Sequence, residues 1–79
     1  MNITSKNYII KIIEIKELRL WNLSSRKTVW SAQAHKGFVK GISWVPFSQN
    51  FVTVGEDKTV KLWDRNEEEV NFYFNIYIK

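Results

Sequence analysis

Cysteine is absent from this sequence of 79 residues, so the chain can form neither a disulfide bridge nor a thiolate metal site. Histidine occurs only once, which argues against a metal site built on imidazoles. The apolar residues 8–15 are interrupted by Lys11 and Glu14, are too short to span a bilayer and lack a signal-peptide cleavage site. We therefore expect no cofactor, no metal ion and no membrane partner. The lack of cysteine suits a protein of the cytosol or nucleus.

Large aromatic rings, by contrast, are plentiful, with four Trp, three Tyr and five Phe in the chain. So many rings in a short sequence indicate a structure that buries or displays them. The length allows one small domain at most. The formal net charge of +4 is mildly basic and only weakly favours acidic partners such as nucleic acid.

Three short runs of β-branched and aromatic residues lie at 38–44, 51–54 and 59–63. Turn-forming residues separate the runs: Pro46 and its neighbours after the first, and Gly-Glu-Asp-Lys at 55–58 after the second. Such runs, bounded by Gly, Pro, Asn and Asp, predict the strands of an antiparallel meander.

Part of this pattern occurs twice in the chain. Residues 17–23 read Glu-Leu-Arg-Leu-Trp-Asn-Leu, and residues 59–65 read Thr-Val-Lys-Leu-Trp-Asp-Arg, so that Trp21 and Trp63 lie 42 residues apart. A period of roughly 40–45 residues is typical of four-stranded propeller blades. One period before Thr53 and Asp57 the sequence has Lys11 and Ile15, so the first copy lacks the polar residues of the second.

Residues 34–64 resemble a WD repeat, the unit of a β-propeller blade. Ala34-His35 stands where the family usually has Gly-His, and Trp63-Asp64 is the closing dipeptide. The resemblance implies an all-β fold. We expect one antiparallel WD-repeat β-propeller blade plus part of a neighbouring blade, and therefore an incomplete propeller.

The resemblance also implies a buried chain of hydrogen bonds through His35, Thr53, Asp57 and Trp63. In the family the indole donates to the hydroxyl, the hydroxyl to the imidazole, and the imidazole to the carboxylate. Each buried polar atom then has a partner, and leaving one without costs roughly 1–3 kcal/mol. We expect this structural tetrad in place of catalysis by Thr53, His35 and Asp57, although they superficially resemble a nucleophile, a base and an orienting acid. We predict that the chain is not an enzyme.

The chain divides into four segments. Residues 1–16 are a divergent N-terminal segment with a possible edge strand, a basic amphipathic helix being the alternative. Residues 17–33 form the last inner and the outer strand of a partial blade, and residues 34–64 form the WD-repeat blade. Residues 65–79 hold an acidic loop at 66–69 and a C-terminal strand whose alternation places Val70, Phe72, Phe74, Ile76 and Ile78 on one face. Seven apolar residues are expected to pack between blades: Phe38, Ile42, Trp44, Phe51, Val54, Val60 and Leu62.

Within the family, residues 33–42 and 53–61 resemble an early blade of a nucleolar branch that belongs to the small-subunit processome. This implies a non-catalytic scaffold for protein–protein interaction in small-subunit ribosomal RNA processing and ribosome biogenesis, located in the nucleus and nucleolus. The implied partners are processome proteins, pre-ribosomal RNA and the adaptor of a cullin ubiquitin ligase, for which the branch is also described as a substrate receptor. Some WD-repeat proteins dock on that adaptor through Trp-Asp-x-Arg, but here Arg65 follows Asp64 directly, so we expect no such motif.

Direct RNA binding is the alternative to a purely protein-binding role. Six basic residues are candidates for contact with RNA or a partner: Arg19, Arg26, Lys36, Lys40, Lys58 and Lys61. A basic groove with stacking rings is what single strands require, and Trp21, Trp30 and Trp44 lie between these cations in the sequence. The opposing interpretation has the indoles in the core and the cations on a solvated face, and we favour it because large rings are mostly buried.

Overall fold

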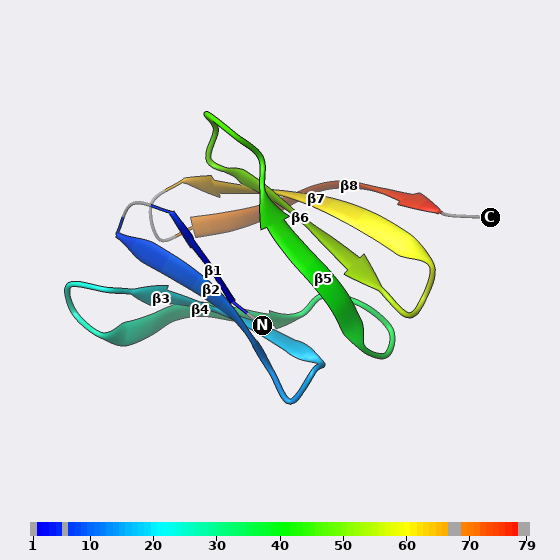
Figure 1. Cartoon of the computed structure of the whole chain (residues 1–79), viewed down its shortest axis with the longest axis horizontal. Helices are drawn as coiled ribbons and strands as arrows, with labels where there is room; N and C mark the ends of the chain where they lie inside the picture. The colour runs from blue at the N-terminus through cyan, green and yellow to red at the C-terminus, as the bar shows by residue number, and fades with distance from the viewer. Residues whose placement is uncertain (1, 6, 67–68, 78–79) are drawn as a thin grey trace.

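The chain folds into two antiparallel four-stranded sheets in a computed structural model that describes residues 2–5, 7–66 and 69–77. In each sheet the strands are neighbours in their sequence order. The first sheet consists of β1 (Asn2–Ser5), β2 (Tyr8–Ile13), β3 (Glu17–Asn22) and β4 (Lys27–Gln33). The second consists of β5 (Val39–Trp44), β6 (Asn50–Gly55), β7 (Thr59–Asn66) and β8 (Glu69–Tyr77). β1 lies beside β5 and β4 beside β8, so the two meanders stand next to one another in the same direction (Figure 1).

The N-terminal segment differs from its prediction. It forms two strands, β1 and β2, where one edge strand was expected, and neither is helical. β2 is not an edge strand, because it pairs with β1 on one side and β3 on the other. The first blade is therefore a complete four-stranded sheet. The helical alternative for residues 1–16 is wrong because β-branched Ile residues fit a pleated strand better.

The turn between β2 and β3 has no sequence signal that would predict it. Glu14 and Ile15 both have positive φ, 51° and 58°. A β-branched residue in this region is uncommon, and no Gly or Asn marks the turn in the sequence. The amide of Val39 donates to the carbonyl of Ile15 at 2.7 Å, which fixes the turn against the second sheet.

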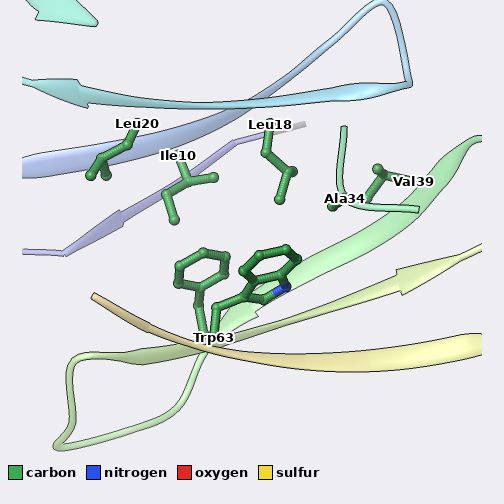
Figure 2. Close-up of a cluster of buried hydrophobic side chains, with 7 residues drawn as sticks. Ile10, Leu18, Leu20, Ala34, Val39 and Trp63 are labelled. Atoms are coloured by element: carbon green, nitrogen blue, oxygen red, sulfur yellow. The ribbon is translucent and has the colours of Figure 1, made fainter. Parts of the chain in front are cut away.

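The hydrophobic core lies between the two sheets. Ile10, Leu18 and Leu20 of the first sheet are fully buried, and they face Phe51 and Trp63 of the second. Figure 2 shows the aliphatic side chains of one sheet above the indole of Trp63. The faces that the sheets turn toward each other are called the inner faces below, and the faces turned away are called the open faces. Each sheet thus buries one side of its pleat by covering the other sheet.

Aromatic contacts join the same two faces. The rings of Trp30 and Trp63 meet edge to face at 5.8 Å, and Phe51 stacks beside Trp63 at 6.0 Å. Arg65 is 2% exposed, and its guanidinium lies 4.2 Å from the ring centre of Tyr8 in β2 and 5.7 Å from that of Trp44 in β5. This planar cation adds a stacking contact across the junction.

The seven residues expected between blades fall into three groups. Phe51 is fully buried, and Ile42 and Trp44 pack against the core. Phe38 is 39% exposed. The remaining three belong to the open face of the second sheet, because their positions alternate with those of the buried residues: Val54, Val60 and Leu62. Because side chains alternate along each strand, these three do not contact the first sheet, and their packing between blades stays a prediction for the open face.

The C-terminal strand departs from its predicted alternation through a β-bulge. Phe72 pairs with Trp63, but Phe74 pairs with the preceding residue, Leu62, so Tyr73 is the extra residue. Cross-strand partners share a face. The bulge therefore places Phe74 on the open face and Phe72 on the inner face. Ile78 lies outside the described residues, as do residues 67 and 68 of the expected acidic loop; Asn66 and Glu69 belong to β7 and β8.

No helix in the part of the chain that the structure describes is long and apolar enough to cross a membrane.

Two phenylalanines four residues apart test where the core lies. Phe51→Ala removes a fully buried ring and should lower the free energy of unfolding by about 3–5 kcal/mol. Phe47→Ala is the matched control, because Phe47 lies fully exposed in the loop between β5 and β6 and its loss should be nearly neutral. Urea unfolding measures both. Equal losses would contradict the placement of the core between the two sheets.

Candidate functional site

Four polar or amphipathic side chains meet at one end of the second sheet. Thr53 of β6 and Trp63 of β7 face inward, since their positions alternate with those of the open face. Asp57 lies in the turn between β6 and β7, and His35 in the loop that crosses from the first sheet to the second. Three of the four are almost fully buried: His35 is 2% exposed, Thr53 0% and Trp63 7%.

Hydrogen bonds join these four side chains in a row. The indole Nε1 of Trp63 donates to Oγ1 of Thr53 at 3.0 Å. That hydroxyl lies 2.7 Å from Nε2 of His35, and Nδ1 of the same ring lies 2.9 Å from Oδ1 of Asp57. The structure thus brings together the four residues of the expected tetrad, in the expected order.

The donors and acceptors determine where the imidazole proton lies. The carboxylate of Asp57 can only accept, so its partner at 2.9 Å, Nδ1 of His35, donates, and Nε2 is left to accept from the Thr53 hydroxyl at 2.7 Å. The ring proton then resides on Nδ1, from which it is donated toward the carboxylate of Asp57. This tautomer gives every polar atom in the row a partner.

Thr59, which the sequence analysis did not single out, belongs to the same network. It is 4% exposed, its hydroxyl donates to Oδ1 of Asp57 at 2.7 Å, and it lies 2.8 Å from Nδ1 of His35. The amide of Thr59 also donates to Oδ1 of Asp57, at 3.2 Å. A Thr two residues after an Asp in a turn is the signal that could have found it, because such side chains commonly bond to the local backbone.

The backbone at Gly55 leaves room for the imidazole. A Cβ at this position would overlap Cγ and Nδ1 of His35 and would lie 2.7 Å from Oδ1 of Asp57. Any side chain would displace the ring from its hydrogen bonds. Gly55 therefore serves close approach to the backbone and not a left-handed turn.

Hydrogen bonding lowers the pKa of the Asp57 carboxyl well below its usual range. Desolvation by partial burial raises this pKa, but the hydrogen bonds that the carboxylate accepts from Thr59, His35 and the amide of Lys36 outweigh it. A carboxylate that accepts several hydrogen bonds is stabilised in its charged form.

The network holds three chain segments together as one surface. The amide of Lys36 donates to Oδ2 of Asp57 at 3.1 Å, and the amide of Glu56 donates to the carbonyl of Phe38 at 2.8 Å. The turn between β2 and β3 joins them through its bond with Val39, and Nζ of Lys16 lies 5.7 Å from the ring centre of Phe38. The segments 14–16, 35–38 and 55–58, which run from the bottom centre to the lower right of Figure 1, are called the rim below.

The six basic residues proposed for RNA or partner contact are distributed over both sheets. Lys36 and Lys58 belong to the rim and are exposed. Arg19 lies on β3, where it pairs with Glu17 at 3.2 Å, and Arg26 lies in the turn between β3 and β4. Lys40 is on β5, and Lys61 is on β7 with its ammonium 5.4 Å from the ring centre of Phe72. Only Lys36 and Lys58 of the six lie on the surface that the network holds together.

The surroundings of Thr53 do not favour nucleophilic chemistry. Its side chain is completely buried, and its hydroxyl already bonds to both Trp63 and His35. A nucleophile must reach a substrate. Within residues 2–5, 7–66 and 69–77, no cluster of three or more His, Asp or Glu side chains could hold a metal ion.

The sequence profile described as "WD domain, G-beta repeat" matches residues 26–64. A protein named "DDB1- and CUL4-associated factor 13" from Dictyostelium discoideum is 42% identical over 55 residues, which are 70% of this chain and 12% of that protein. The protein of the same name from Homo sapiens is 51% identical over 47 residues, which are 60% of this chain and 11% of that protein. The chain therefore spans about an eighth or less of these relatives' length.

Solved structures show the same architecture at low sequence identity. The β-propeller domain of Cps50 (Swd1) from Myceliophthora thermophila superposes with a TM-score of 0.73 at 6% identity, over 90% of this chain and 25% of that one. A chain of the Mitotic Checkpoint Complex gives a TM-score of 0.72 at 17% identity, over 91% of this chain and 23% of that one. The two sheets are accordingly propeller blades, and they make up part of a propeller.

The network predicts a large difference between two acidic residues in one turn. Asp57→Ala should leave His35, Thr59 and the amide of Lys36 without their acceptor, which lowers the free energy of unfolding by roughly 1–3 kcal/mol. Glu56→Ala, one residue earlier and exposed, should change it little. Thermal melts of both variants give the comparison, and similar melting temperatures would refute the structural role of the network.

The lowered pKa of Asp57 predicts a specific acid sensitivity. Its folded pKa lies below its unfolded value of about 4, so its contribution to stability is present above that pH and is lost as the pH falls toward the folded pKa. Asp57→Asn cannot titrate and should show a shallower loss of unfolding free energy below about pH 4 than the unmodified chain. Parallel slopes for the two proteins would mean that the carboxylate is not stabilised in the fold.

Proposed function

Because the chain carries a WD repeat and its two sheets are β-propeller blades, we propose that it is a non-catalytic scaffold for protein–protein interaction. The observation that carries the proposal is the rim. A buried hydrogen-bond network with one side chain from each of four segments holds loops in place, whereas the loops themselves are exposed. Rigid loops lose little conformational entropy when they bind a partner.

The rim has an apolar centre and a border with charges of both signs, as an interface with another protein would require. Ile15 and Phe38 are exposed to 52% and 39%. The same segments expose the cationic side chains of Lys16, Lys36 and Lys58 and the anionic side chains of Glu14 and Glu56. An apolar centre with a charged border is the usual arrangement of a protein interface. The rim is the surface through which this scaffold contacts its partner.

The relatives' printed name supports a partner of a particular kind. They are named for association with DDB1 and CUL4, and the proposed assembly for this chain is the same ubiquitin ligase. A role in small-subunit ribosomal RNA processing, in the nucleolus, is the finer part of the proposal. It rests on the resemblance of residues 33–42 and 53–61 to the nucleolar branch of the family.

Arg65 does not serve as the docking residue in this assembly. It is 2% exposed and stacks between Tyr8 and Trp44. A partner could reach its guanidinium only by separating the two sheets. Contact with the ligase adaptor is therefore assigned to the rim.

Capture of purified DDB1 by the immobilised chain tests the proposal. The unmodified chain should retain the adaptor, and Phe38→Ala combined with Lys36→Glu should reduce retention at least tenfold, the order expected when an anchor residue is lost. Lys27→Glu is the control, because Lys27 is exposed at the start of β4, away from the rim, and should retain binding. No retention by the unmodified chain, or equal retention by all three, would contradict the proposal.

A second arm of the experiment addresses RNA. The lysines of the rim are few, so any binding of single-stranded RNA should be weak and should fall steeply with salt. Tight RNA binding that is insensitive to Lys36→Glu would show that the rim is not the contact surface.

A further inference from the structure

The open face of the second sheet is mainly apolar, and that of the first combines Ile9, Ile13 and Trp21 with Lys11, Arg19 and Glu17; neither face carries a covering element among the described residues. On the second sheet, the apolar part of the open face has side chains from three strands: Val52, Val54, Val60, Leu62, Phe74 and Ile76. Phe74 is 51% exposed and Ile76 56%. Exposed apolar patches of this kind mark interaction surfaces or aggregation sites.

This open face repeats the inner face of the first sheet. With the period of 42 residues, Val52, Val60 and Leu62 correspond to Ile10, Leu18 and Leu20. Those three aliphatic residues are fully buried in the chain, against Phe51 and Trp63. The second sheet therefore presents outward the same aliphatic pattern that the first sheet presents to its neighbour.

The bulge extends the correspondence to the outer strand. In the first sheet the register shifts between Leu20 and Trp21, and in the second it shifts between Leu62 and Trp63, one period later. Leu20 pairs with Trp30, and Leu62 pairs with Phe74. Phe74 thus occupies the position of Trp30, whose ring meets Trp63 edge to face at 5.8 Å.

Two residues on the open face of the first sheet correspond to residues on the inner face of the second sheet. Ile9 and Trp21 lie one period before Phe51 and Trp63, which form the inner face of the second sheet. These two residues line a hollow of about 160 Å³ together with Lys11, Asn22, Leu23 and Arg26. Ile9 is smaller than Phe51, and this leaves space for a ring.

We propose that a second copy of the chain covers this hollow, with its Phe74 face packed onto the Trp21 face of the first copy. The contact reproduces between copies the packing that joins the two sheets within one copy. In the contact between copies, Trp21 occupies the position that Trp63 has in the junction within one copy, and Phe74 occupies the position of Trp30. Lys11 occupies the position that Thr53 has in the second sheet. Its ammonium lies 5.2 Å from the ring centre of Trp21, so a cation contacts this indole where Trp63 has a hydroxyl.

Such an interface joins two different faces, so a pair of copies retains one open Trp21 face and one open Phe74 face, one on each copy. Head-to-tail contacts of this type form a ring where the rotation closes. Since each copy supplies two sheets, a ring of about two to four copies would hold the four to eight blades of ordinary propellers.

Sedimentation of the 79-residue chain, with and without blocked faces, tests the proposal. The unmodified chain should form oligomers of defined size. Phe74→Asp and Trp21→Asp each place a charge in one half of the interface and should each be monomeric alone. Mixed together, they should form a one-to-one dimer, because one retains the Trp21 face and the other retains the Phe74 face.

The experiment includes one control variant outside the interface and two variants that replace any blocking variant that does not fold. Tyr77→Asp alters a more exposed ring on the same strand, and Tyr77 pairs with Thr59 of the inner face, so this variant should assemble like the unmodified chain. Circular dichroism checks that each variant is folded. If either blocking variant is unfolded, Ile76→Asp and Leu23→Asp replace Phe74→Asp and Trp21→Asp, because both side chains are largely exposed.

Three results would overturn the proposal. The first is an unmodified chain that is folded and monomeric at every concentration. The second is dimerisation of Trp21→Asp alone, which would mean that the Phe74 face pairs with itself. The third is the absence of a dimer when the two folded blocking variants are mixed.

Discussion

The burial of a single imidazole constrains the rest of the structure. The ring of His35 has no solvent to bond with, so both of its nitrogens need partners in the protein. The hydroxyl of Thr53 and the carboxylate of Asp57 provide them, and Trp63 completes the hydroxyl's bonding. One side chain from each of a loop, two strands and a turn must therefore keep its place. The loops of the rim are ordered because a displaced loop would leave a buried polar atom without a partner.

The second constraint is that a sheet has two faces. Each blade covers one face of its neighbour, and the core of this chain is that one junction. Repeat architectures generally bury a continuous core only when several units stack. Two sheets therefore leave two faces open, one mainly apolar and one that adds charged residues to Ile9 and Trp21, and the repeat of 42 residues relates these faces to the two halves of the buried junction. The same periodicity that builds the core of one copy supplies the interface between copies.

Much of the second sheet could be predicted from its sequence. Its strands alternate with marked turns, and His35, Thr53, Asp57 and Trp63 stand at recognisable spacing. The first sheet was harder, because the turn at Glu14 and Ile15 has positive φ without Gly or Asn. Lys11 takes the place of Thr53 there, so the first blade lacks the four-residue spacing that identifies the second.

Other features depend on tertiary contacts that a linear pattern does not contain. The bulge at Tyr73 shifts the alternation of the last strand by one residue, and nothing in that strand predicts it. The burial of Arg65 depends on Tyr8, which is far away in sequence and comes close only when the sheets pack. Thr59 was overlooked because the expected tetrad already satisfied the spacing.

Partners on both sides hold His35 as a single tautomer. Long-range proton–nitrogen correlation spectra of the imidazole in the folded chain measure this directly. We expect a proton on Nδ1 that exchanges slowly with solvent and an unprotonated Nε2. A proton on Nε2, or rapid averaging between the two nitrogens, would contradict it.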